Sequence, residues 1–455
     1  MTPAALPDLA TAASAVERRE LSPVELVKGC LDRVAARSAA LNAFIAVFDR
    51  EATAQAKRAE SEIQNGRYRG PLHGIPISVK DLVDVAGALT TSGSAVPPRN
   101  PTHDAPVVAH LRRAGAIIIG KTNLHEFAFG TTSEDSAYGP VRHPIDPSRS
   151  AGGSSGGAAV AIVEGMCFGS IGTDTGGSVR IPSAACGITG LKGTLGEVSC
   201  EGVVPLSETL DHVGPLTRTV TDAALLWHAM MGRPPRPPQP AESLWISTPR
   251  RYFFDVLDDD VRELMAETIR RLQKAGHTVE DVAVAHVERI ADVYLHISLS
   301  EAAWYHAPLL AQYADRYTPP VRLRLEMGRY IQAEDYVRAM HARSVLRTAV
   351  DRALEGADAL LLPALAIAAP PIGAASVAVG DTRHPVRALM LRLTQLFNIT
   401  GHPAIALPMG IGRDGLPRGL QLVGHRGATD RLLEVARAVE RQITGGAGSV
   451  GGGTG

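Results

Sequence analysis

The spacing of apolar residues predicts alternating helices and strands along most of the chain. Apolar positions recurring every three or four residues indicate helices, and short β-prone apolar runs bounded by glycine or proline indicate strands. The predicted helices cover 7–19, 23–37, 50–64, 104–113, 158–164, 221–231, 259–275, 297–314, 332–355, 385–397 and 429–442. The predicted strands cover 42–48, 75–79, 116–119, 244–248, 278–283, 359–362, 404–408 and 419–423. This alternation predicts an α/β layer architecture.

The length of the chain allows two or three domains, and large α/β units of this size also occur as one. The chain has 455 residues, 45% hydrophobic and 20% charged, which is typical of a globular protein with a sizeable core. A proline-rich segment is the clearest internal boundary, and its stiffness suits a surface crossover. We expect one domain over 1–442, with N-terminal helices (1–66), a core (67–231), the proline-rich crossover (232–242) and a C-terminal part (243–442). The glycine-rich tail, 443–455, is expected to be disordered.

Charge and cysteine content exclude several classes of protein. The formal net charge is −1 and no basic run occurs, which argues against nucleic-acid binding. No apolar run reaches 18 residues and the N-terminus lacks a basic leader, so we expect no membrane segment and a cytoplasmic location. The cysteines form no C-x-x-C pair and are expected to be free thiols: Cys30, Cys167, Cys186 and Cys200.

The stretch Gly115–Thr122 matches the phosphate-binding pattern G-x-x-x-x-G-K-[ST]. A true phosphate-binding loop follows a strand and opens a helix. Here a predicted helix precedes the stretch, and its central residues, 116–119, favour a strand themselves. We therefore interpret the match as accidental.

Two glycine-serine stretches, 152–157 and 173–178, are the most distinctive feature of the chain. Glycines at this density let backbone N–H groups converge, and serines among them present hydroxyls beside those donors. This combination suits acyl transfer, which needs a nucleophile next to groups that stabilise an oxyanion. The sequence therefore predicts a hydrolytic serine in this region.

Other interpretations of these stretches have weaker support. Gly152–Gly156 also fits the G-x-S-x-G nucleophile elbow, but residues 142–150 before it contain prolines and charges and do not predict the required strand. A flexible linker is disfavoured because a predicted helix follows at once. The 15 histidines include no H-E-x-x-H spacing that would support a metal hydrolase.

The motifs together resemble the amidase signature family. The two serines, Ser154 and Ser178, stand 24 residues apart, and Lys80 precedes the first by 74 residues, both as in the family. The resemblance extends to about residue 440 and rests on segments 74–81, 152–157, 172–182, 186–193, 211–218, 221–226, 401–404 and 415–424. It implies a three-layer α/β/α fold with a central mixed β-sheet.

The resemblance also implies a catalytic triad. Ser178 would be the nucleophile that forms an acyl-enzyme, and Ser154, preceded in the family by a cis peptide bond, would bridge it to Lys80. The lysine must be a neutral amine to act as a base, and burial at the end of an apolar strand lowers a lysine pKa. Asp174 and Arg180 would brace the loop. The oxyanion hole would consist of the backbone N–H groups of Thr175, Gly176, Gly177 and Ser178.

Departures from the family bear on the substrate. The glutamine-using A subunit of the glutamyl-tRNA amidotransferase has an acidic residue where approximate alignment places Leu391. A leucine cannot bind an ammonium group, so we expect neutral, apolar or aryl linear amides or carbamates, with possible urethanase or aryl acylamidase activity. The other residues expected at the substrate are Phe127, Ala128, Phe129, Gly130 and Thr131.

Two alternatives remain open at this point: an ammonia-delivering A subunit of a tRNA-dependent complex, and a catalytically silent binding protein on the same fold. The resemblance implies no cofactor and no metal. We expect a small-molecule substrate and a monomer or homodimer.

Overall fold

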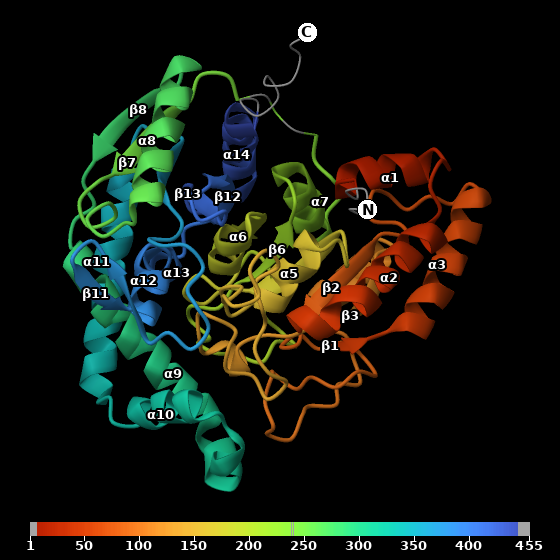
Figure 1. Cartoon of the computed structure of the whole chain (residues 1–455), viewed down its shortest axis with the longest axis horizontal. Coiled ribbons are helices and arrows are strands. Elements are labelled where there is room, and N and C mark those ends of the chain that lie inside the picture. The colour runs from red at the N-terminus through yellow and green to blue at the C-terminus, as the bar shows by residue number, and fades with distance from the viewer. Residues whose placement is uncertain (1–6, 238, 240, 445–455) are drawn as a thin grey trace.

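Eleven strands form one mixed β-sheet in the computed structural model, which describes residues 7–237, 239 and 241–444. Helices lie on both sides of this sheet (Figure 1). The three-layer α/β prediction is therefore confirmed. In spatial order the strands are β1 (Phe44–Val47), β3 (Ile117–Thr122), β2 (Pro76–Lys80), β4 (Gly169–Thr173), β6 (Val213–Thr217), β5 (Thr189–Lys192), β12 (Ala404–Ile411), β13 (Pro417–Val423), β9 (Ala359–Pro363), β7 (Trp245–Pro249) and β8 (Thr278–Val282). A separate hairpin pairs β10 (Ser376–Val379) with β11 (Thr382–Pro385).

Most predicted helices are present, but the helices at 180–186 and 319–328 were not predicted, and the helix predicted at 297–314 begins at Ile290. The helix predicted at 385–397 is two helices, and the helix predicted to begin at 221 begins at Val220 and is capped by Thr219. The helices are α1 (Leu9–Glu17), α2 (Pro23–Leu41), α3 (Asp49–Gln64), α4 (Pro106–Arg113), α5 (Gly156–Val163), α6 (Arg180–Cys186), α7 (Val220–Met230), α8 (Asp259–Lys274), α9 (Ile290–Tyr313), α10 (Pro319–Gly328), α11 (Ala333–Ala353), α12 (Val386–Arg392), α13 (Gln395–Thr400) and α14 (Thr429–Thr444).

The centre of the sheet places the ends of two strands together. β2 and β4 run parallel, with Ile77 opposite Gly169 and Val79 opposite Ile171. Parallel strands end at the same edge of a sheet, so Lys80 and Thr173, the last residues of β2 and β4, are neighbours. The fold thus brings a lysine to the start of the second glycine-serine stretch.

The structure rules out the other interpretations of the glycine-rich motifs. Gly115–Thr122 runs into strand β3 rather than a loop, and Lys121 Nζ lies 2.7 Å from Asp81 Oδ1. Residues 142–150, all of them described, contain no strand of the sheet, so the nucleophile-elbow topology is missing. Residues 152–157 are all buried. They are therefore a packed segment and not a flexible linker.

The boundary segments are described only in part. Residues 232–237 of the proline-rich crossover are largely exposed, and 238 and 240 lie outside the described residues. The predicted tail begins too early, because α14 continues to Thr444; residues 445–455 lie outside the described residues. Within the described ranges no helix is long and apolar enough to cross a membrane. All four cysteines are free thiols, three of them buried.

Candidate active site

Lys80 lies wholly buried at the end of β2. Its Nζ forms hydrogen bonds with Ser154 Oγ at 2.8 Å and with Thr173 Oγ1 at 2.7 Å. Burial lowers the pKa of Lys80 from 10.5 to about 7, and the negative charges of Asp174 and Asp211 offset part of this effect. A large share of the lysine is therefore an uncharged amine near neutral pH.

Ser154 is held rigidly between backbone segments. It follows a cis peptide bond from Gly153, as the family resemblance implies. A Cβ on Gly153 would lie 2.8 Å from the backbone nitrogens of Thr132 and Ser133, so only glycine fits there. The Ser154 carbonyl accepts hydrogen bonds from the His125 N–H at 3.1 Å and from Ser133 Oγ at 3.2 Å. These contacts fix the hydroxyl that Lys80 reaches.

Ser178 lies beside this pair and is almost completely buried, with 5% of its surface exposed. Its carbonyl accepts a hydrogen bond from the Ser155 N–H at 3.2 Å, which ties it to the segment that carries Ser154. Among the described residues, no hydrogen bond joins the hydroxyls of Ser154 and Ser178. The structure thus joins Lys80 to Ser154 directly and places Ser178 next to them through the backbone.

The loop 174–178 presents unoccupied backbone donors beside Ser178. The N–H of Asp174 donates to His212 O at 2.9 Å, and those of Val179 and Arg180 donate to Asp174 Oδ2. Within the described part of the chain, the N–H groups between them have no protein acceptor. They belong to Thr175, Gly176, Gly177 and Ser178, the residues expected to form the oxyanion hole.

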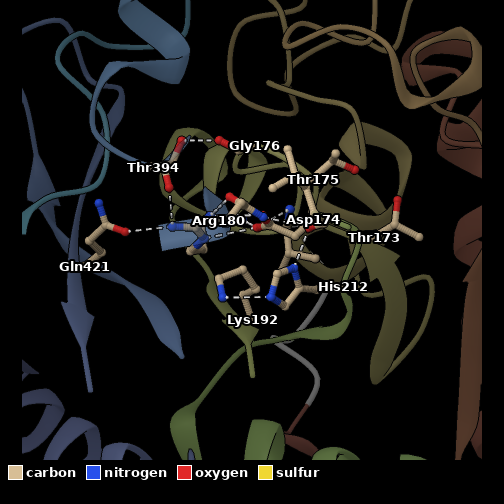
Figure 2. A network of polar contacts seen from close by, with 12 residues as sticks. Thr173, Asp174, Thr175, Gly176, Arg180, Lys192, His212, Thr394 and Gln421 are labelled. Atoms are coloured by element: carbon tan, nitrogen blue, oxygen red, sulfur yellow. Dashed lines mark hydrogen bonds and ion pairs between the residues drawn. The ribbon is translucent and has the colours of Figure 1, made fainter. Parts of the chain in front are cut away.

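A buried ion pair braces this loop (Figure 2). Asp174 accepts from Arg180 Nη2 at 2.9 Å and from Arg180 Nε at 3.1 Å, and Asn398 Nδ2 donates to it at 2.8 Å. These donors hold the pKa of Asp174 well below its usual range despite burial. Arg180 also donates to Gln421 Oε1, and Thr394 Oγ1 donates to Gly176 O at 2.6 Å. The pair therefore positions the loop, in agreement with its expected bracing role.

Two glycines of this loop are required by close packing. A Cβ on Gly176 would lie 2.4 Å from Tyr294 Oη, and one on Gly177 would lie 2.3 Å from Thr394 Oγ1. Gly177 also has a φ of 138°, which side chains disfavour. The glycines thus allow Tyr294 and Thr394 to approach the amide donors.

Several buried polar side chains beside the loop 174–178 had no predicted role. His212 Nδ1 lies 2.7 Å from Leu210 O, and Lys192 Nζ donates to His212 Nε2 at 3.2 Å (Figure 2). Burial lowers the pKa of both side chains. Asp211 accepts a hydrogen bond from Thr175 Oγ1, and burial raises its pKa to about 6. The Asp211-His212 pair stands in a motif that carried the resemblance, and this motif was the available signal.

The residues expected at the substrate lie in different environments. The ring of Phe127 packs against His306 and Tyr317, with centroids 4.4 and 5.4 Å away, so it belongs to an interior aromatic cluster. Leu391 borders the loop, since its Cδ2 would lie 3.0 Å from a Cβ on Gly176. Phe129 is buried beneath two arginine side chains. Of these three residues, Leu391 is the one that contacts the oxyanion loop.

The remaining three expected residues support neighbouring segments. Ala128 is buried, has a positive φ of 58° and donates its N–H to His125 O at 2.8 Å. A Cβ on Gly130 would lie 2.0 Å from the His125 ring, so this position requires glycine. The Thr131 carbonyl carbon would lie 2.9 Å from a Cβ on Gly153. Their contacts link the segment to the backbone that precedes Ser154.

Metal ligands are not clustered at this site. Among the described residues, no three histidine, cysteine, aspartate or glutamate side chains are grouped so that they could hold a metal ion.

Known proteins match the chain over nearly its full length. The amidase family model matches residues 25–433. An amidase of Pseudomonas putida is 38% identical, with 96% of each chain covered. The A subunit of the glutamyl-tRNA(Gln) amidotransferase of Anaeromyxobacter dehalogenans is 35% identical, again with 96% of each covered. A crystal structure of an amidase superimposes with a TM-score of 0.92 at 37% identity, covering 96% of this chain and all of the other. The chain belongs to the amidase signature family of amide-bond hydrolases.

Proposed function

We propose that the chain hydrolyses C–N bonds of amides and carbamates through an acyl-enzyme on Ser178. The observation that carries the proposal is the buried Lys80 amine within hydrogen-bond distance of Ser154 Oγ. An amine with a pKa of about 7 can accept a proton at neutral pH, which an ordinary lysine cannot do. Lys80 thus supplies the base that a serine nucleophile requires.

In the proposed first step, Ser178 Oγ attacks the substrate carbonyl. Its proton passes to Ser154 Oγ, and the Ser154 proton passes to Lys80 Nζ. Catalytic hydrogen bonds often shorten only once substrate is bound, so the Ser154–Ser178 contact is expected to close in the complex. The tetrahedral oxyanion accepts from the N–H groups of the 175–178 loop, each worth about 3 kcal/mol.

In the second step the amine leaves with the proton returned from Lys80 through Ser154. The carbonyl carbon is now bound to Ser178 Oγ as an ester. Water attacks this ester, gives its proton along the same route, and releases the acid and the free Ser178 hydroxyl. A carbamate reacts in the same way: its amine leaves, a carbonate ester remains on Ser178 Oγ, and water releases a carbonic acid monoester that loses carbon dioxide to give the alcohol.

The substrate group beside Leu391 is neutral and apolar in this proposal. Leu391 borders the oxyanion loop and offers no charge to an ammonium group. An aliphatic or aryl group gains free energy there by leaving water, about 25 cal/mol for each Å² of apolar surface buried. We therefore propose aliphatic or aryl amides and aryl carbamates in preference to free glutamine.

Turnover of small p-nitroanilides and aryl carbamates by the isolated chain tests the proposal. Ser178→Ala should abolish release of p-nitroaniline, and Lys80→Ala should nearly abolish it. Ser155→Ala is the matched control, because this serine is buried in the same stretch and, among the described residues, its Oγ donates a hydrogen bond to a backbone carbonyl alone, that of Thr173 at 3.3 Å. Equal rates in Ser178→Ala and Ser155→Ala would refute the mechanism.

The second candidate, an ammonia-delivering A subunit, is favoured by the 35% identity to such a protein. The same assay separates the two functions. Turnover without ATP, tRNA or a second protein excludes an obligate partner. Glutamine hydrolysis that appears only with partner proteins would favour the ammonia-delivering function instead.

A further inference from the structure

Arg387 on α12 is a cation that has no acidic partner among the residues the structure describes. Its guanidinium lies over the ring of Phe129, 5.7 Å from the centroid. Burial lowers the pKa of Arg387, and only the Tyr294 phenol acts in the opposite direction. Among the described residues, no carboxylate forms an ion pair with this guanidinium. Partly buried charges are normally paired, because desolvation without compensation is costly.

Arg387 lies near the oxyanion loop. The Tyr294 phenol interacts with the charge of Arg387. The Tyr294 hydroxyl also packs against the oxyanion loop, since a Cβ on Gly176 would lie 2.4 Å from it. Leu391 also packs against Gly176, and it follows Arg387 by one turn of α12. Residues four apart on a helix are neighbours, with Cβ atoms roughly 5–6 Å apart. The arginine is therefore about one helical turn beyond the position assigned to the apolar group of the substrate.

A second guanidinium makes the local excess of positive charge larger. Arg324 also lies over the Phe129 ring, 5.4 Å from the centroid. The carboxylate of Asp135 lies 3.9 Å from the Arg324 guanidinium and also 3.1 Å from His125 Nε2. Burial and the charge of Arg387 lower the pKa of Arg324 to about 10. The charges of Asp135 and Glu126 offset part of this effect on Arg324, and neither carboxylate forms an ion pair with Arg387.

We propose that the substrate carries an anionic group, most simply a carboxylate, which pairs with Arg387. This inference rests on the proposed function and refines it: the group beside Leu391 is apolar, and the anion lies about one helical turn further from the reacting carbonyl. A guanidinium binds a carboxylate through two parallel N–H···O bonds, which fixes both distance and orientation. The alternative is a purely structural contact between Arg387 and the Phe129 face.

Three matched substrates test the proposal. Pentanoyl p-nitroanilide is neutral, glutaryl p-nitroanilide carries a carboxylate at the end of its acyl chain, and N-pentanoyl-4-aminobenzoate carries one on the leaving group. We expect at least one of the two carboxylated substrates to have a higher kcat/KM than pentanoyl p-nitroanilide. Arg387→Gln should lower that kcat/KM about 10- to 100-fold, the range of a lost charge-assisted hydrogen bond, and change the value for pentanoyl p-nitroanilide less than about twofold.

Arg387→Lys should retain part of the preference for the carboxylated substrate, because the positive charge remains while the bidentate hydrogen-bond geometry is lost. The control is Arg383→Gln, an exposed arginine of the neighbouring β11 that contacts Ser376; it should leave all three values unchanged. A wild-type preference for the neutral substrate, or an equal loss on charged and neutral substrates in Arg387→Gln, would overturn the proposal.

Binding to the Ser178→Ala variant separates this inference from the proposed chemistry. Calorimetry should show tighter binding of glutaramate than of pentanamide, and Arg387→Gln in the same background should remove the difference. Such a result would support the anion site even if no hydrolysis is found. Equal binding of glutaramate and pentanamide, together with equal binding of N-pentanoyl-4-aminobenzoate and pentanoyl p-nitroanilide, would refute it even if the enzyme hydrolyses neutral amides.

Discussion

The acid limb of the pH–rate profile follows from the burial of Lys80. Its pKa of about 7, against 10.5 for an exposed lysine, corresponds to roughly 5 kcal/mol between the two protonation states. At pH 7 about half of the amine is neutral, whereas an exposed lysine would be neutral in about one molecule in 3,000. Because the neutral amine is the base, kcat/KM should rise about tenfold for each pH unit below 7 and level off above it.

Thr173→Val tests the origin of this limb. The substitution removes the hydroxyl that lies 2.7 Å from Lys80 Nζ and keeps the branched shape of the side chain. The ammonium form then loses an acceptor, so the pKa of Lys80 falls. A hydrogen bond to a charged group contributes about 1.5–3 kcal/mol, which moves the limb about one to two pH units lower. The assay is kcat/KM for a p-nitroanilide between pH 5 and 9, with folding checked by circular dichroism.

Asp211 is the other buried group that titrates nearby, with a pKa raised to about 6. Asp211→Asn distinguishes the two assignments. If the limb belongs to Lys80, the variant keeps it and moves it to lower pH, because a negative charge that favours the ammonium is gone. Disappearance of the limb in Asp211→Asn, or an unmoved limb in Thr173→Val, would refute the role of Lys80.

Three further outcomes are expected. Ser154→Ala should lower kcat less than loss of the nucleophile, since Lys80 can still act through a water; equal losses in single-turnover assays would contradict the relay. Arg180→Met should lower the free energy of unfolding by about 3–5 kcal/mol in urea titrations, because Asp174 is left charged and buried, and adding Asp174→Asn should recover part of it. Gly153→Ala should lower the melting temperature because its Cβ meets backbone atoms, whereas Gly29→Ala, in open space within α2, should be neutral or stabilising by up to about 1 kcal/mol.

Most helices and the outer strands could be predicted from periodicity, but the centre of the sheet could not. β4, with the sequence Gly-Ser-Ile-Gly-Thr, has low β-propensity and is buried throughout, so it shows no alternation. A Cβ on Gly172 would lie 2.7 Å from a methyl group of Leu216 on the neighbouring β6. Close packing around small residues decides this part of the fold, and a local pattern does not reveal it.

The triad positions, the oxyanion loop and its bracing pair Asp174 and Arg180 were predicted through the family resemblance, whereas the residues that reach this loop from distant segments were not. Asn398 and Gln421 reach Arg180 from segments more than 200 positions away. Gln421 stands in segment 415–424, which carried the resemblance, but the local hydrophobic pattern does not indicate this contact. The contact between Arg387 and Phe129 also joins residues far apart in the sequence. The sequence predicts only that Arg387 lies on a helix, and the fold then places its guanidinium over the Phe129 ring. Long-range contacts of this kind depend on the packed fold.

Three buried lysines show what selects the base. Burial lowers the pKa of Lys80, Lys121 and Lys192 alike, so a lowered pKa cannot identify the catalytic one. Lys121 Nζ pairs with the Asp81 carboxylate and donates to Thr90 Oγ1, and Lys192 Nζ donates to two backbone carbonyls and an imidazole. None of those partners is a serine of the two glycine-serine stretches, so none could pass on a proton from the nucleophile. Lys80 alone of the three contacts Ser154, and the proton route is therefore decided by its neighbours.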